Sequence, residues 1–162
     1  MEVPGILIIG YGNVLRGDDG VGIHVARELE RQFHDDPEVE IIACQQLTPE
    51  MAEDISGGEL VIFLDAACVG EPGTVRCRQI HADSPSGYTH DVSPEALVAA
   101  AEQLYGELPK AFSITLSGFS FDMGSRLSRA AQLLLPEVVR QAREVITSHR
   151  KNLPVAAALP VQ

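Results

Sequence analysis

Short runs of apolar residues recur along the chain and are separated by segments with a different pattern. The runs at residues 5–10, 39–43, 60–64 and 112–116 are expected to form strands, because short aliphatic runs beside turn residues are typical of buried strands. Residues 74–80 instead alternate apolar and charged side chains, which indicates a half-exposed strand at a sheet edge. The pattern therefore predicts about five strands.

Between these runs, apolar side chains return every three or four positions, as they do in residues 22–33. Thr48 and Ser93 are each followed by proline, a pairing typical of a helix cap and the first helical position. Pro136 is expected to break the last helical segment into two pieces. Helices are predicted at residues 22–33, 48–55, 93–105 and 128–150.

The alternation of strands and helices predicts an α/β fold. We expect a three-layer α-β-α sandwich around a mostly parallel, twisted sheet of about five strands, with one antiparallel strand at an edge. The wholly aliphatic first and third strands support burial of both sheet faces. No repeat or second domain is visible, so residues 1–150 are predicted to form a single domain and residues 151–162 a flexible C-terminal tail.

Composition narrows the classes of partner. The net charge of −11 argues against nucleic acid and against an anionic membrane, since both bind basic surfaces, but it fits a cation or a locally basic protein. Three cysteines without C-x-x-C spacing are typical of a reducing compartment, with neither disulfides nor a zinc–thiolate site. No signal peptide is visible and no apolar run approaches the roughly 20 residues of a membrane helix, so we expect a soluble, cytoplasmic protein.

Acidic residues follow two of the predicted strands. Residues 10–20, GYGNVLRGDDG, carry Asp18 and Asp19, and Asp65 ends the third strand. If the strand order is 2-1-3, Asp19 and Asp65 open into one crevice, and a later loop with His81 and His90 can fold over it. Clustered carboxylates repel one another unless a cation joins them, and two carboxylates with an imidazole suit nickel or zinc better than copper(I).

Simpler interpretations of the same residues stay open. Asp19 can be the N-cap of the first long helix, Asp65 can cap the turn after its strand, and a single loop histidine such as His90 is more often solvated than bound to metal. A phospho-accepting receiver domain also has acids after strands one and three, but its acid pair directly follows the strand. A dinucleotide-binding loop is excluded, because Leu15 stands where its third glycine belongs.

Several stretches together resemble the maturation proteases of nickel–iron hydrogenases. The most specific is the pattern G-x-G-N-x-L-x-x-D-D-x-x-G from Gly10 to Gly22, which is joined by a strand ending in FLDA and a histidine loop before a Ser-Pro helix. Residues 118–121 and 124–128 are similar to the family's last loop before its C-terminal helix. The resemblance extends from residue 6 to about residue 145.

The resemblance implies a function and a set of site residues. Members are cytoplasmic endopeptidases that remove a C-terminal extension from the hydrogenase large-subunit precursor after nickel insertion. By motif, the catalytic and metal-binding trio maps to Asp19, Asp65 and His90. His90 is preferred over His81 because it stands just before Asp91 and the Ser-Pro helix start.

The same resemblance leaves the metal and the partner partly open. The nickel is expected to be supplied by the substrate protein, although zinc is also possible, and a non-catalytic nickel chaperone would use the same trio. Residues 44–48, CQQLT, replace a D-G-G-T-like turn of many members, so which hydrogenase is served stays open.

Overall fold

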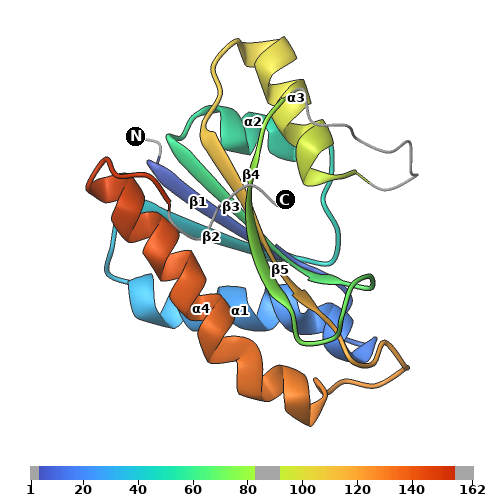
Figure 1. Cartoon of the computed structure of the whole chain (residues 1–162). Helices are drawn as coiled ribbons and strands as arrows, with labels where there is room; N and C mark the ends of the chain where they lie inside the picture. The colour runs from blue at the N-terminus through green and yellow to red at the C-terminus, as the bar shows by residue number, and fades with distance from the viewer. Residues whose placement is uncertain (1–3, 83–91, 156–162) are drawn as a thin grey trace.

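The computed structural model describes residues 4–82 and 92–155 (Figure 1). The elements follow one another as β1 (Ile6–Tyr11), the short 3-10 helix η1 (Gly17–Gly20), α1 (Val21–Phe33), β2 (Val39–Cys44), α2 (Met51–Ser56), β3 (Leu60–Ala67), β4 (Val75–Ile80), α3 (Pro94–Tyr105), β5 (Lys110–Ser117) and α4 (Arg129–Arg150).

The described strands form one sheet in the order β2-β1-β3-β5-β4. β1 pairs in parallel with both β2 and β3, β3 pairs in parallel with β5, and the edge strand β4 runs antiparallel to β5. This confirms the predicted α/β class, the mostly parallel sheet and the single antiparallel edge strand. The strand order reverses between β1 and β3, where ligand sites form in open α/β sheets.

Helices cover both faces of the sheet (Figure 1). α1 and α4 lie on one face, where they pack against Ile6 and Ile8 of β1. α2 and α3 lie on the other face, against Leu7 and Ile9 of the same strand. Successive side chains of a strand point to opposite faces, so burial on both faces explains why β1 is a continuous aliphatic run. No helix in the described part of the chain has the length and apolar character needed to cross a bilayer.

The N-terminus of α1 packs very closely against the sheet. A Cβ atom on Gly22 would lie 2.3 Å from the carbonyl oxygen of Leu64, and one on Gly10 would lie 2.2 Å from the carbonyl oxygen of Gly22. Only glycine fits at such distances. These two contacts hold the loop between β1 and α1 over the carboxyl ends of β1 and β3.

Two details of the predicted helices are wrong. α2 begins at Met51, with Glu50 as N-cap, and Thr48 lies in a preceding turn where its carbonyl oxygen accepts a hydrogen bond from the Met51 N–H at 3.1 Å. α4 runs unbroken through Pro136. Residues on both sides of this proline, Ala131 and Val138, are buried in the core, and this packing keeps the helix continuous despite the missing N–H.

The other predicted elements are present with small shifts at their ends. Ser93 is the N-cap of α3, as predicted, and its Oγ accepts a hydrogen bond from the Ala96 N–H at 3.1 Å. β3 continues two residues past Asp65, to Ala67. The predicted flexible tail falls largely on residues 156–162, which lie outside the described residues.

Candidate functional site

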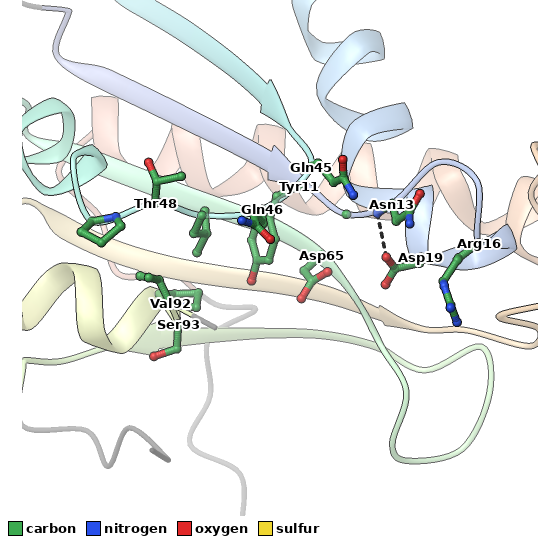
Figure 2. A pocket seen from close by; sticks show the side chains of 14 residues that line it. Tyr11, Asn13, Arg16, Asp19, Gln45, Gln46, Thr48, Asp65, Val92 and Ser93 are labelled. Carbon is green, nitrogen blue, oxygen red and sulfur yellow. Dashed lines mark hydrogen bonds between the residues drawn. The ribbon is translucent and has the colours of Figure 1, made fainter. Parts of the chain in front are cut away.

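A cavity of about 740 Å³ opens at the carboxyl ends of β1 and β3, where the strand order reverses (Figure 2). Its walls come from the loop after β1, the loop after β2, the end of β3 and the start of α3. The described lining residues are Tyr11, Gly12, Asn13, Arg16, Asp19, Gln45, Gln46, Leu47, Thr48, Pro49, Asp65, Val92, Ser93 and Pro94.

Asp19 is fixed in this cavity by the glycine turn that precedes it. Gly12 has a φ of +142°, and a Cβ there would lie 1.9 Å from the Asp19 carbonyl oxygen. Only glycine can therefore occupy position 12 in this turn. The N–H of Asn13 donates to Asp19 Oδ2 at 2.7 Å. The N-cap of α1 is Gly20, which makes no side-chain capping bond, so the interpretation of Asp19 as a helix cap is wrong.

The neighbouring Asp18 is directed away from the cavity and is fully buried. Its carboxylate accepts hydrogen bonds from the N–H groups of Phe119, Ser120 and Ser128, at 2.8, 3.2 and 2.7 Å, and from the Ser128 hydroxyl at 2.8 Å. Burial alone would raise the pKa of Asp18, but these bonds hold it below its ordinary value. Asp18 therefore ties the loop after β1 to the loop before α4.

Asp65 stands in β3 opposite Thr115 of β5 and lines the cavity. Its Oδ1 accepts a hydrogen bond from the N–H of Ala66 at 2.7 Å, which is a local bond within the strand. Burial raises the pKa of Asp65 to about 7, and the negative charge of Asp19 acts in the same direction against the hydrogen bonds from Ala66 and Tyr11. The two carboxylates are thus close enough to interact.

Tyr11 is a site residue that the sequence analysis missed. It ends β1, one residue past the Gly10–Leu64 pair of the β1–β3 register, and its hydroxyl hydrogen-bonds to Asp65. Figure 2 shows Asp65 between Tyr11 and Asp19. Burial and the charge of Asp65 raise the pKa of Tyr11, so the phenol stays protonated and acts as the donor. The parallel register of β1 and β3 was the signal that could have identified it.

An ion pair joins β4 to α3 beside this tyrosine. Arg78 of β4 is paired with Glu95 of α3, whose side chain is nearly buried. The charges of both residues act on the Tyr11 phenol. The pair fixes the first turn of α3, and so it holds Ser93 at the wall of the cavity.

The predicted histidine ligand cannot be placed, because His90 lies outside the described residues. His81, the other candidate, is exposed directly after β4 and is not among the described residues that line the cavity. Within residues 4–82 and 92–155, no three His, Cys, Asp or Glu side chains form a group that could hold a metal ion. The described part of the site therefore brings Asp19 and Asp65 into one cavity, and the metal-binding trio of Asp19, Asp65 and His90 stays a prediction.

The wall formed by the loop after β2 is polar and uncharged. Gln45, Gln46 and Thr48 contribute side chains that donate and accept hydrogen bonds. Together with the two carboxylates, they give the cavity several groups that can hydrogen-bond to a ligand.

The chain is similar in sequence to one curated protease. It is 29% identical over 119 residues to the hydrogenase 2 maturation protease of Escherichia coli K12. The aligned region covers 70% of this chain and 71% of that protein. No protein-family model matches the chain.

Solved structures give the same result at the level of the fold. The nickel–iron hydrogenase maturation protease HycI from Thermococcus kodakarensis superposes with a TM-score of 0.73 at 22% identity, over 89% of this chain and 93% of that one. The hydrogenase 2 maturation peptidase of a Thaumarchaeota archaeon superposes with a TM-score of 0.66 at 25% identity, over 87% and 97%. Sequence similarity, fold and the motif from Gly10 to Gly22 agree, and the chain is a homologue of the hydrogenase maturation proteases.

Proposed function

We propose that this protein is an endopeptidase that removes the C-terminal extension from the precursor of a nickel–iron hydrogenase large subunit after nickel insertion. Similarity to the hydrogenase 2 maturation protease of Escherichia coli K12 supports the reaction and the partner. The observation that carries the proposal for this chain is the position of Asp19 and Asp65 in one cavity, at the point where the strand order of the sheet reverses.

The nickel in this proposal belongs to the substrate, and Asp19, Asp65 and His90 bind it. Two carboxylates held close enough to repel one another are a favourable site for a divalent cation, and carboxylate with imidazole suits nickel or zinc. His90 stands two positions before Val92 in the sequence, and Val92 lines the cavity. Cleavage then depends on whether the precursor has been loaded.

The chemistry needs an activated water and a polarised carbonyl group. A divalent cation held by Asp19, Asp65 and His90 would supply this chemistry, since such an ion can polarise a carbonyl group and lower the pKa of a water molecule. One of the two carboxylates, Asp19 or Asp65, would accept the proton that the water gives up. The polar loop from Gln45 to Thr48 lies where it can contact the extension, so it is a candidate for selecting which hydrogenase is processed.

The variants Asp19→Ala, Asp65→Ala and His90→Ala test the site with nickel-loaded precursor as substrate. We expect each to slow shortening by at least ~100-fold, a loss of about 3 kcal/mol of transition-state stabilisation. Asp35→Ala is the matched control, since Asp35 is an exposed acid outside the cavity. Full activity of the Asp65 variant would contradict the proposal, and nickel transfer by the wild type without shortening would favour a chaperone.

A further inference from the structure

Large apolar side chains are exposed beside the cavity, on the two loops that Asp18 ties together. Leu15, Phe119 and Met123 expose 57%, 42% and 79% of their surface. We call these three residues the rim patch. Leu15 stands between Asn13 and Arg16 in the sequence, and both of these residues line the cavity, so the patch begins on a loop of the site.

The backbone beneath the rim patch is fixed by hydrogen bonds between the loops. The N–H of Gly124 donates to the Leu15 carbonyl oxygen at 2.9 Å, and the N–H of Gly17 donates to the Gly124 carbonyl oxygen at 3.0 Å. Arg16 and Gly124 form a parallel bridge, so Leu15 and Met123 are neighbours across it. Apolar side chains held in place in this way lose little entropy when a partner covers them.

Basic residues surround the patch in a chain that is otherwise strongly acidic. The same two loops and the start of α4 expose three arginines, Arg16, Arg126 and Arg129. The exposed carboxylate in these segments is Asp122. The whole chain has only 12 Lys and Arg residues and a net charge of −11, so this concentration of positive charge is local. Apolar side chains with arginine are typical of the centre of protein interfaces.

We propose that the rim patch binds the folded surface of the substrate precursor next to the segment that enters the cavity. This inference rests on the proposed function and adds a docking surface to it. A peptide bound at Asp19 and Asp65 lies beside the loop that carries Leu15, because Asn13 and Arg16 of this loop line the same cavity. In the proposed complex, the body of the precursor to which the peptide is attached lies against Leu15 and Met123. The arginines fit a precursor surface that is apolar and fringed with acidic residues.

The double variant Leu15→Ser/Met123→Ser tests the proposal. Its matched control is Leu104→Ser/Leu153→Ser, which removes two leucines with exposures of 68% and 55% from α3 and from the segment after α4. The Kd for the nickel-loaded, full-length precursor is measured by biolayer interferometry. We expect the rim variant to bind at least ~10-fold more weakly, and the control variant to bind like the wild type. Shortening by the rim variant slows at low precursor concentration and recovers when the precursor is raised above the new Kd.

Arg126→Glu provides an independent variant should the double substitution disturb folding. It reverses an exposed charge, and we expect weaker precursor binding with a smaller dependence on salt. Unchanged Kd values for both variants would overturn the docking proposal, as would a wild-type dimer that the rim variant abolishes, because the patch would then bind a second copy. Precursor that binds through the patch but is never shortened would overturn the endopeptidase function and leave the docking surface supported.

Discussion

At the scale of single residues, adjacent aspartates have opposite roles. Asp18 and Asp19 follow one another in η1, so their side chains diverge: one is buried between loops and the other lines the cavity. The sequence pattern identified the pair but did not distinguish its members, because the partners of Asp18 lie about a hundred residues away.

Removal of the Asp18 carboxylate is expected to destabilise the fold. Asp18→Ala removes a buried carboxylate that accepts hydrogen bonds from the N–H groups of Phe119, Ser120 and Ser128, so we expect the free energy of unfolding to fall by about 3 kcal/mol. Urea denaturation measures this loss. Asp35→Ala, in an exposed position, is expected to change stability by less than about 0.5 kcal/mol, and an equally small effect at Asp18 would contradict the role assigned to it.

Asp65 is expected to make the protein less stable as the pH rises. Its pKa is about 7 in the folded chain and about 3.9 in an unfolded one, so between pH 4 and 7 the folded state holds more protons and the free energy of unfolding falls with increasing pH. About three pKa units correspond to on the order of 4 kcal/mol. Denaturation from pH 4 to 8 with a chelator present should show this slope in the wild type and lose it in Asp65→Asn. Parallel curves for the two proteins would contradict the assignment.

Tyr11 is expected to hold the Asp65 carboxylate in place for a cation. Tyr11→Phe keeps the ring and removes only the hydrogen bond, so we expect binding of Zn²⁺ or Ni²⁺ to weaken by roughly 10-fold. Isothermal titration calorimetry measures the affinity, and Tyr105→Phe, at an exposed tyrosine, is the control. Equal affinities in the wild type and the Tyr11 variant would mean that the hydroxyl has no such role.

At the scale of elements, apolar patterning predicted the strands and most helices, and tertiary packing decided the exceptions. α4 continues through Pro136 because its apolar face is buried on both sides of the proline, which local propensity does not reveal. α2 begins after Thr48 because the Thr48-Pro49 pair forms a turn first. β3 extends past Asp65 because β5 pairs with it as far as Ala67.

The contact between α1 and the sheet gives a prediction at this scale. Glycine is usually less stable than alanine in a helix, yet Gly22→Ala would place a Cβ 2.3 Å from the Leu64 carbonyl oxygen. We therefore expect the substitution to lower the free energy of unfolding by about 2 kcal/mol or more. Gly5→Ala is the control, since a Cβ there meets its nearest neighbour at an ordinary 3.9 Å. A stabilised Gly22 variant in thermal or urea unfolding would show that the helix does not pack this closely.

At the scale of the whole molecule, the strand order determines the site. The order β2-β1-β3, on which the sequence argument for a shared crevice depended, brings the loop after β1 beside the end of β3, and this places Asp19 and Asp65 in one cavity. Tyr11 and the Arg78–Glu95 pair could not be predicted, because they depend on side-chain direction and on how α3 meets β4. The assignment of His90 as the third ligand stays a prediction, as it lies outside the described residues.

The most direct test of the account is the intact mass of the large-subunit precursor after incubation with the wild-type protein, with and without bound nickel. The account predicts that the nickel-loaded precursor loses one C-terminal segment and that the nickel-free precursor keeps its full mass. Equal shortening of both forms would show that metal is not what the two carboxylates recognise, and shortening of neither would contradict the endopeptidase function.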